Sequence, residues 1–394
     1  MLMSLSCTVL GVGLFIVTQA TTSGFEKFFV KAILGADGAI RVEDKLQDTL
    51  RSIMAARSGG QGGEPEGLRF IEGVDEPTLV MDALRQFANV TGASAVIRAT
   101  VDVRSAFKND TAQIFGVDID AHIKVSNLDQ HVVAGTIMTF RNKASGALVG
   151  RELADRLQLS VGDSFLIGKQ GDARRFQVSA IYETGVSDID KVRIYVHLGE
   201  ARSLLKKPSG VSFIQLDLRD PARAEADAAQ MERVVGYSAK PWQRREKVWL
   251  DVFHALRVSS GITVTVFTLI ASLAMFNTLA MIVIEKTKDI AILRSMGYER
   301  RDVTRIFLWQ AVIVLVIGAV LGSVFGALGT WAVSKVPLKL HGIIVTKTYV
   351  VDPSAWHYVA AVATAAVMVM IASIIPARRA ARLEPGEIVR GSAA

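Results

Sequence analysis

Two long stretches without a single ionisable residue constrain this chain more than any other feature of its sequence. Val258 to Ile284 and Ile306 to Ser334 each have the roughly 20 apolar residues that a helix needs to cross a hydrocarbon layer of about 30 Å. Between them lies the charged segment 285–305, EKTKDIAILRSMGYERRDVTR. A segment that joins two membrane-spanning helices must emerge on one face of the membrane, so we predict a short loop there.

This loop has the pattern of a short amphipathic helix. Ile290, Leu293 and Met296 recur at helical spacing. Asp289 suits the positive first turn of such a helix, and Gly297 suits the left-handed residue that ends one. The apolar stripe needs a surface to pack against. From periodicity alone, that surface is equally well the lipid, the chain's own helices or another protein.

Two further uncharged stretches predict two more membrane spans. Residues 1–24 favour a retained span over a cleaved signal peptide, because the basic n-region of a signal is missing. Since no residues precede this span, we expect the true start codon to lie upstream. The predicted order is therefore span 1–24, soluble part 25–257, span 258–284, loop 285–305, span 306–334, loop 335–354, span 355–377 and tail 378–394.

Composition agrees with a membrane protein that has a large soluble part. The mean hydropathy is +0.33 and half of the residues are hydrophobic, yet 21% are charged. The net charge of +7 does not indicate a nucleic-acid partner, because acidic residues balance the basic ones except beside the spans. The single cysteine, Cys7, excludes a disulfide framework and a cysteine-based zinc site.

The soluble part mixes helical and strand patterns irregularly, which favours an α+β domain. We expect a helix over 148–159, and the glycine-rich segment 58–67 is typical of a flexible loop. A hairpin is predicted to pair 164–168 with 175–181. Further strands are expected at 95–103, 112–117, 192–196 and 212–218, and a further helix at 221–235.

Two amphipathic helices are expected to act as stalks between the membrane and this domain. The first follows span one and carries Phe25, Phe28 and Phe29 on one side. The second, 242–257, has a stripe that includes Trp242, Trp249 and Phe253, and it runs without interruption into span two. Together with that span it would be about 60 Å long, twice the apolar thickness of a bilayer.

The third span carries Gly318, Gly322 and Gly326 at a spacing of four, which predicts a flat face for close helix packing. Charge sets the orientation, because the loop 285–305 and the tail are rich in lysine and arginine. By the positive-inside rule both are cytoplasmic, and the soluble domain lies outside. Four helices enclose little space, so we expect the working unit to be at least a dimer.

The residues needed for several kinds of catalysis or transport are missing from the sequence. It contains no phosphate-binding loop, no H-E-x-x-H pair and no G-x-S-x-G elbow. The middles of the spans lack the ionisable residues that ion-coupled transporters use. We therefore expect a subunit without catalytic residues, metal or cofactor of its own.

Several segments resemble a known family. The segments EKTKDIAILRSMGYERRDVTRIFLWQ and PARRAARLEPGEIVRG, with one span before and three after a large domain, resemble the FtsX/MacB/LolC-type permeases of ABC transporters. Four others resemble the LolC/LolE subunits of lipoprotein-releasing transporters: SGFEKFFVKAILG, GRELADRLQLSVGD, FQVSAIYETGVSDID and WQRREKVWLDVFHALRV.

The resemblance implies a mechanism and a set of partners. The loop helix would be a coupling helix that docks on a separate LolD-like ATPase, which binds ATP and magnesium. The domain would be periplasmic, in a bacterial inner membrane, and the stalks would transmit motion to it while lipoproteins pass from the membrane to a periplasmic carrier. A second permease, identical or paralogous, would complete the complex. The docking residues would be Asp289, Ile290, Ala291, Leu293, Arg294, Met296 and Gly297.

One departure from the family bears on the carrier. LolC-type subunits hook the carrier with a long hairpin loop, and this chain has only the short turn Gly168 to Arg175 in that place. Two other functions share the four-span layout. One is a MacB-like exporter of periplasmic cargo or drugs, and the other is an FtsX-like regulator of a periplasmic hydrolase that moves no substrate.

Overall fold

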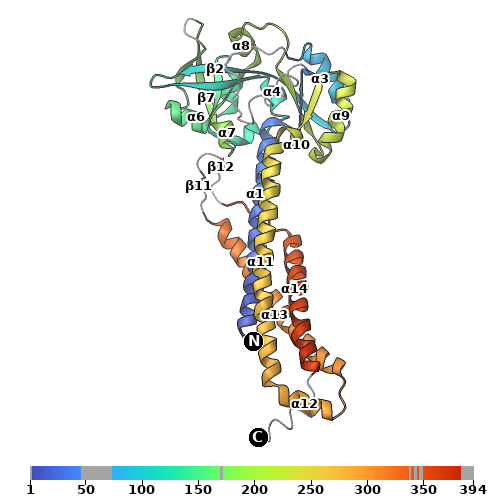
Figure 1. The fold of residues 1–394 in the computed structure, drawn as a ribbon. Helices are drawn as coiled ribbons and strands as arrows, with labels where there is room; N and C mark the ends of the chain where they lie inside the picture. The colour runs from blue at the N-terminus through green and yellow to red at the C-terminus, as the bar shows by residue number, and fades with distance from the viewer. Residues whose placement is uncertain are drawn as a thin grey trace, which may run out of the picture. The chain divides into compact units, whose positions relative to one another are not determined.

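The computed structural model describes residues 2–45, 73–168, 172–336, 339–340, 344–345 and 349–382 of the chain (Figure 1). It divides into two compact units. The membrane unit comprises residues 1–27, 251–337 and 348–394, and the α+β unit comprises 28–250 and 338–347. The predicted flexible loop 58–67 and the tail after Arg382 lie outside the described residues.

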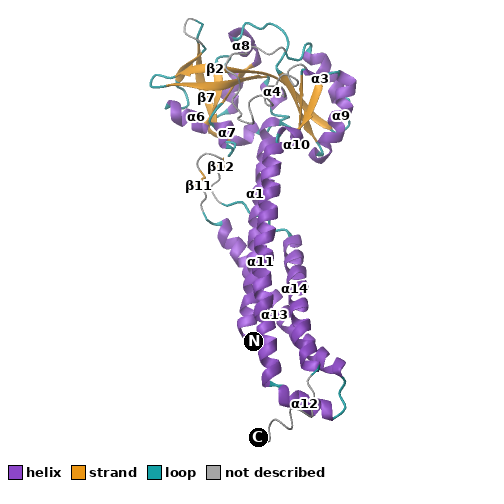
Figure 2. Cartoon of the chain, in the orientation of Figure 1, coloured by secondary structure: helices purple, strands orange, loops and turns teal. Residues whose placement is uncertain are grey.

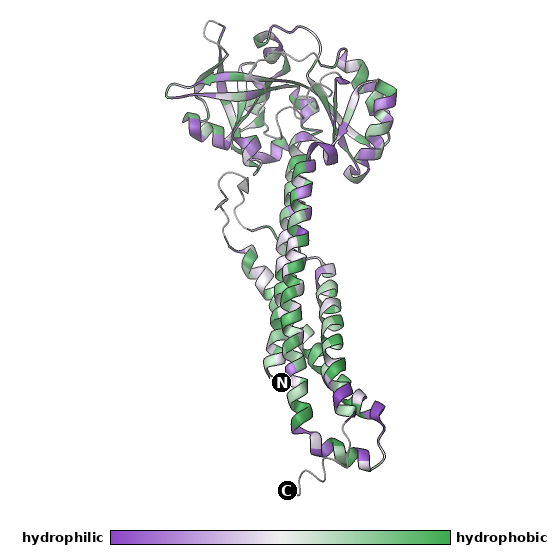
Figure 3. Ribbon diagram, viewed as in Figure 1, coloured by the Kyte–Doolittle hydropathy of each residue, from purple (hydrophilic) through white to green (hydrophobic). Residues whose placement is uncertain are grey.

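Long helices dominate the chain at both ends (Figure 2). Four of them are long and apolar enough to cross a membrane, and Figure 3 shows their predominantly hydrophobic colouring. Each includes one of the four predicted spans and continues into flanking polar residues, because these do not interrupt helical hydrogen bonding. The helices are α1 (Leu2–Asp37), α11 (Lys247–Glu285), α13 (Arg300–Ser334) and α14 (Ala355–Ala381), with the short α12 (Thr287–Ser295) between α11 and α13.

The α+β unit is built on one mixed sheet of ten strands, ordered β10-β1-β9-β2-β3-β8-β5-β7-β4, with β6 bridging β2 and β7. Most neighbours are antiparallel, but β3 with β8 and β5 with β7 are parallel. The strands are β1 (Ile40–Glu43), β2 (Val90–Arg104), β3 (Asn109–Val117), β4 (Val132–Gly135), β5 (Gly146–Gly150), β6 (Ser164–Ile167), β7 (Arg174–Tyr182), β8 (Arg193–His197), β9 (Phe213–Leu218) and β10 (Ser238–Pro241).

Short helices connect these strands, which agrees with the predicted α+β class. They are α3 (Pro77–Arg85), α4 (Ile119–His122), α5 (Ile137–Asn142), α6 (Arg151–Leu157), α7 (Ser187–Asp190), α8 (Leu198–Leu204), α9 (Ala224–Val235) and α10 (Trp242–Arg245), with 3-10 turns η1 (Leu128–His131) and η2 (Pro221–Arg223). Within the predicted loop 335–354, two short strands pair with each other: β11 (Lys339–Leu340) and β12 (Ile344–Val345).

The predicted hairpin is present, with Phe165 opposite Phe176 in the pairing of β6 with β7. The predicted helix 148–159 is wrong in its first part. Leu148 and Val149 belong to β5, where they pair with β8 and are fully buried. A run of buried apolar residues fits a central strand as well as a helix, so periodicity could not separate the two.

The predicted unbroken helix from residue 242 into the second span is also wrong. Helix α10 ends at Arg245, and Glu246 adopts φ −104° and ψ 22° before α11 begins at Lys247. Trp242 lies before this break, and its indole nitrogen donates a hydrogen bond to the carbonyl of Pro221 at 3.0 Å. It therefore packs on the α+β unit instead of continuing the stripe of α11.

Candidate functional site

The candidate site is the charged turn of the membrane unit that contains α12. Helix α12 spans Thr287–Ser295, within the segment whose apolar stripe the sequence singled out. The ammonium of Lys286 lies 3.1 Å from the carboxylate of Asp289 in its exposed first turn. This acidic residue is favourable there because the amino end of a helix carries partial positive charge.

The structure divides the predicted docking residues between two faces of α12. Ile290 and Ala291 are buried in the membrane unit, where Ile290 joins the cluster that includes Val303 and Phe307 of α13. On the other side, Ile292 is 58% exposed and Met296 is 72% exposed. The open apolar face therefore centres on Ile292 and Met296.

A further predicted docking residue, Arg294, fastens α12 in place. Leu293 is half-buried, and the guanidinium of Arg294 donates a hydrogen bond to the carbonyl of Ala381, the last residue of α14, at 3.0 Å. A cation is favourable at this position because the carboxyl end of a helix carries partial negative charge. Arg294 thus holds α12 against α14 from inside the unit.

The turn after α12 is fully hydrogen-bonded. Gly297 has φ +99°, a left-handed conformation that favours glycine. The amides of Gly297 and Tyr298 donate to the carbonyls of Arg294 and Leu293, at 3.2 and 3.3 Å, in the pattern of a Schellman cap. Helix α13 then begins with a capping box between Glu299 and Asp302. Only Met296 to Glu299 separate the two helices.

The three glycines predicted to form a flat face lie on α13 against α1. A β-carbon added to Gly318, Gly322 or Gly326 would lie 2.8, 2.8 or 2.9 Å from side-chain atoms of α1. Real β-carbons do not approach other atoms so closely, so these positions require glycine. The side chains that occupy the space belong to Thr8, Val12 and Ile16.

The aromatic residues predicted for the stalks form pairs within each unit. In the membrane unit, the rings of Phe25 and Phe253 lie 5.6 Å apart in an edge-to-face arrangement. In the α+β unit, Phe29 is buried, and its ring lies 4.8 Å from that of Trp249. Such contacts add to the stability gained from burial alone. Phe28 is half-buried.

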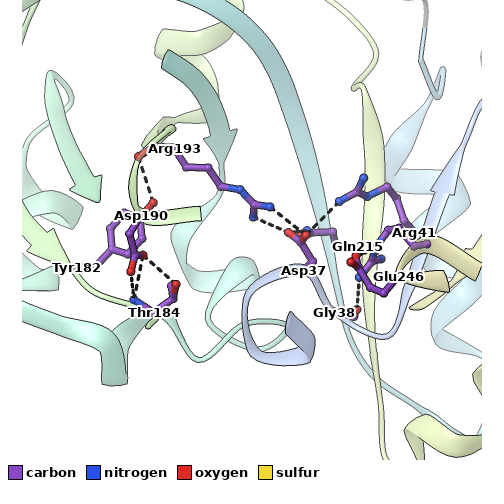
Figure 4. A network of polar contacts seen from close by, with 10 residues as sticks. Asp37, Gly38, Arg41, Tyr182, Thr184, Asp190, Arg193, Gln215 and Glu246 are labelled. Carbon is purple, nitrogen blue, oxygen red and sulfur yellow. Dashed lines mark hydrogen bonds and ion pairs between the residues drawn. The ribbon is translucent and has the colours of Figure 1, made fainter. Parts of the chain in front are cut away.

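Sequence reasoning missed a buried charge network in the α+β unit (Figure 4). Asp37, at the end of α1, receives two hydrogen bonds from Arg193 of β8, at 2.5 and 3.0 Å. The guanidinium of Arg41 in β1 lies 3.5 Å from the same carboxylate and 4.4 Å from the centre of the Phe213 ring. Burial and the nearby charge of Arg245 lower the pKa of Arg41 to about 9.

A second buried carboxylate lies in the same unit. Asp190 accepts hydrogen bonds from the backbone amides of Thr184 and Gly185, at 3.0 and 3.1 Å, and from the Thr184 hydroxyl at 2.8 Å (Figure 4). Burial raises the pKa of Asp190 to about 6, although these hydrogen bonds favour the charged form. The first network joins elements of the α+β unit that are distant in sequence, and the second joins α7 to the residues just before it.

Within the described ranges, no group of three or more His, Cys, Asp or Glu residues could hold a metal ion. The arrangement instead provides an exposed apolar helix face, a close-packed helix pair and a rigidly hydrogen-bonded turn. Four helices of membrane-spanning length and an α+β unit built on a ten-stranded mixed sheet define a multi-pass membrane protein with a large folded domain.

Comparison with known proteins identifies the family within this class. Residues 1–234 match the MacB-like periplasmic core domain, and residues 261–385 match the FtsX-like permease C-terminal domain. The chain therefore belongs to the family of FtsX-like permeases that carry a MacB-like periplasmic core domain, and it has four candidate membrane helices.

Two curated relatives and one solved structure illustrate the similarity. The lipoprotein-releasing system transmembrane protein LolC of Xylella fastidiosa (strain Temecula1) is 27% identical over 97% of this chain and 91% of its own length. LolE of Haemophilus influenzae is 26% identical over 78% of this chain and 79% of its own length. The periplasmic region of MacB from Actinobacillus actinomycetemcomitans superposes on 55% of this chain and 94% of its own length, with 11% identity and a TM-score of 0.36.

Proposed function

We propose that this chain is the permease subunit of an ABC transporter that releases lipoproteins from the bacterial inner membrane. The observation that carries the proposal is the similarity to a lipoprotein-releasing LolC protein over nearly the full length of both chains. The exposed face of α12 supports it, because a permease without a nucleotide site needs a surface on which a separate ATPase can act.

In this proposal α12 docks on a LolD-like ATPase, which binds the ATP and magnesium. Ile292 and Met296 would enter an apolar groove of that partner, as helix-in-groove contacts do. The buried residues Ile290 and Ala291 would support α12 from behind instead of contacting the ATPase. Together with Arg294, which is bonded to α14, this gives three of the predicted docking residues a structural role and adds Ile292 to the docking face.

The energy would reach the periplasmic domain by mechanotransmission along two stalks. Helix α1 would be one stalk and the start of α11 the other, with the domain inserted between the first two spans. The charge network at Asp37 supports this role for α1, because it fixes the last turn of that helix to β1 and β8. A buried bidentate pair holds its geometry better than exposed ion pairs do.

The remaining partners follow from the same proposal. Lipoproteins would enter laterally from the membrane lipid, a second permease copy or paralogue would complete the transport path, and a periplasmic carrier would receive the cargo. The β6–β7 connection is short, from Gly168 to Ala173, and its centre lies outside the described residues. If the second permease is a paralogue, it would capture the carrier, and this chain would take the LolE-like position.

Depletion of the chain in its own bacterium tests the proposal. Lipoproteins destined for the outer membrane should accumulate in the inner membrane, as measured by separating the two membranes and comparing their lipoprotein content. Re-expression of the wild-type chain should restore sorting. Unchanged lipoprotein sorting after depletion would contradict the proposal.

A MacB-like exporter is the second candidate, favoured by the match of residues 1–234 to the MacB-like periplasmic core domain. It would pass periplasmic cargo or drugs to an outer-membrane duct through an adaptor protein. Deletion would then raise drug sensitivity and leave lipoprotein sorting intact. Isolation of the native complex would separate the two candidates by the subunits that copurify.

A further inference from the structure

A basic cleft lies in the membrane unit where α13 begins and α14 ends. Its volume is about 370 Å³. Five guanidinium groups face it, three from the first turns of α13 and two from the last turns of α14. The lining residues are Arg300, Arg301, Thr304, Arg305, Arg378, Ala381 and Arg382.

The charge of this cleft is not neutralised by the described part of the chain. Across the described ranges, no carboxylate lies within 4.0 Å of any of the five guanidinium groups. Glu299 and Asp302, the acidic neighbours of Arg300 and Arg301, form the capping box of α13, in which their carboxylates bond to backbone amides. Five like charges around one cavity repel one another, so an anion in the cleft is strongly favoured.

Helix dipoles explain the positions of only some of the five arginines that line the cleft. Arg378 and Arg382 complement the negative carboxyl end of α14. Arg300, Arg301 and Arg305 lie at the amino end of α13, where the dipole disfavours positive charge. The positive-inside rule accounts for the side of the membrane on which these residues lie, but it does not require them to meet at one cavity.

The depth of the cleft identifies the kind of anion. On α13, Ile306 and Trp309 are exposed apolar residues directly after Arg305. On α14, Ile375 is exposed three residues before Arg378. These side chains belong to helices of membrane-spanning length, so the arginines lie where the lipid-facing surface ends. That is the depth of phospholipid headgroups, and a tryptophan is typical of the same interface.

We propose that the cleft binds the phosphate headgroup of an anionic phospholipid from the adjoining leaflet. The headgroup would tie the start of α13 to the end of α14 through charge-assisted hydrogen bonds. Ala381 lines the cleft, and its carbonyl accepts the hydrogen bond of Arg294 from α12. The lipid would therefore also stabilise the end of α14 on which α12 rests.

Lipid binding to the purified full chain tests this inference without the ATPase. The chain in neutral-detergent micelles is titrated with phosphatidylglycerol or phosphatidylcholine, and bound lipid is counted by native mass spectrometry. We expect phosphatidylglycerol to bind about tenfold more tightly, because each arginine near the surface contributes to the binding of an anionic lipid. An Arg301→Gln, Arg378→Gln double variant should bind both lipids equally.

Arg379 provides a matched control. It is exposed and adjacent to Arg378, yet it does not line the cleft, so Arg379→Gln should keep the preference for phosphatidylglycerol. If the first double variant fails to fold, Arg300→Gln with Arg382→Gln removes the same charge from the cleft. Equal affinity of the wild type for both lipids would overturn the inference, as would a preference that survives either folded double variant. Displacement of phosphatidylglycerol by an excess of inorganic phosphate would overturn the assignment to lipid.

Discussion

The membrane unit and the α+β unit are stabilised by different means. In the membrane unit, large apolar side chains such as Ile262 and Val320 are exposed, and three glycines of α13 pack closely against α1. In the α+β unit, large apolar side chains fill the core, and Asp37, Arg41 and Asp190 are buried among them. The first arrangement suits a hydrocarbon surrounding, and the second suits water.

The contrast shows where each unit tolerates change. Between membrane helices there is little hydrophobic gain from association, so packing distance decides stability. In the α+β unit a buried charge is tolerated only while its partners remain. Substitutions should therefore destabilise the membrane unit mainly through steric clashes and the α+β unit mainly through buried charges that lose their partners.

The largest effect is expected from Asp37→Ala in the α+β unit. It would leave Arg193 and Arg41 buried without their shared carboxylate, at a cost of about 3–5 kcal/mol in the free energy of unfolding. Hydrogen exchange of β8 in the full-length protein would measure this loss. The matched control is Lys206→Ala, which breaks the exposed pair with Asp172 and should cost less than about 1 kcal/mol. Similar losses of unfolding free energy in both variants would contradict the distinction between buried and exposed ion pairs.

The next largest effect concerns the exposed face of α12. Changing Ile292 and Met296 together to Asp should weaken binding to the proposed ATPase partner by about 2–4 kcal/mol, because charged groups would enter the proposed apolar groove. Calorimetric titration of the purified subunits would measure the change. Leu79→Asp places one such charge on an exposed apolar site in α3 and should leave the affinity unchanged. Undiminished binding of the α12 variant would remove the docking assignment.

Leu293 lies at the edge of the exposed face of α12, so a substitution there tests how far the ATPase contact extends. It is half-buried, so Leu293→Asp should reduce ATPase capture by a smaller amount than the double variant, roughly 1–3 kcal/mol. A pull-down with tagged ATPase at several concentrations would rank the variants. Capture at the wild-type level would show that the contact surface ends before Leu293.

We expect the free energy of unfolding of the α+β unit to depend on pH through His122, by an amount similar to the effect of Leu293→Asp. Burial lowers its pKa to about 4, and its Nδ1 lies 3.2 Å from the Ser94 hydroxyl. In the unfolded chain the pKa returns to about 6.5, so the unfolded state binds the proton first as pH falls. The folded state should therefore lose about 2–3 kcal/mol between pH 6.5 and 4 through this residue.

The variant His122→Phe isolates that contribution. Asp190, with its pKa raised to about 6, titrates with the opposite sign, since its protonation favours the folded state as pH falls from 6 to 4. The contribution of Asp190 to the free energy of unfolding is present in both proteins, so it cancels when the variant is compared with the wild type. Hydrogen exchange of β2 across pH 7 to 4 should show a flatter loss of stability in the variant. Parallel pH curves would contradict the assignment.

The smallest effect should come from the glycine face of α13. A β-carbon at Gly322 would lie 2.8 Å from that of Val12, so Gly322→Ala should cost about 1–3 kcal/mol. Gly261 in α11 has nothing within 4 Å of its β-carbon position, and Gly261→Ala should stabilise its helix slightly. Thermal unfolding in detergent would reveal the opposite signs. A loss of stability in both variants would indicate an effect of helix composition instead of packing.

Much of the membrane unit could be predicted from the sequence, because its signals are local. The uncharged runs before Glu285 and after Arg305 lie within the two helices that flank α12, and Gly297 has the expected positive φ. The direction in which α12 faces could not be predicted. Ile290 and Leu293 share one stripe by spacing, but only the position of α13 and α14 decides that Ile290 is buried.

The α+β unit was less predictable because its decisive contacts are distant in sequence. Asp37 and Arg193 are separated by 156 positions, and neither has an unusual neighbour pattern. Leu148 and Val149 fit a helix by composition until the parallel pairing of β5 with β7 is known. The arginines at the end of the fourth span indicated topology, but their convergence with those of α13 required the structure.

The carboxyl-terminal cap of α12 lies directly before the amino-terminal capping box of α13. This arrangement limits how far the turn between the two helices can deform when a force acts on α12. The amides of Gly297, Tyr298 and Glu299 all have partners, so the turn cannot stretch or twist without breaking hydrogen bonds. A displacement applied at Met296 would have to carry the beginning of α13 with it. The whole of α13 would then slide or tilt, and this motion would strain its glycine contacts with α1.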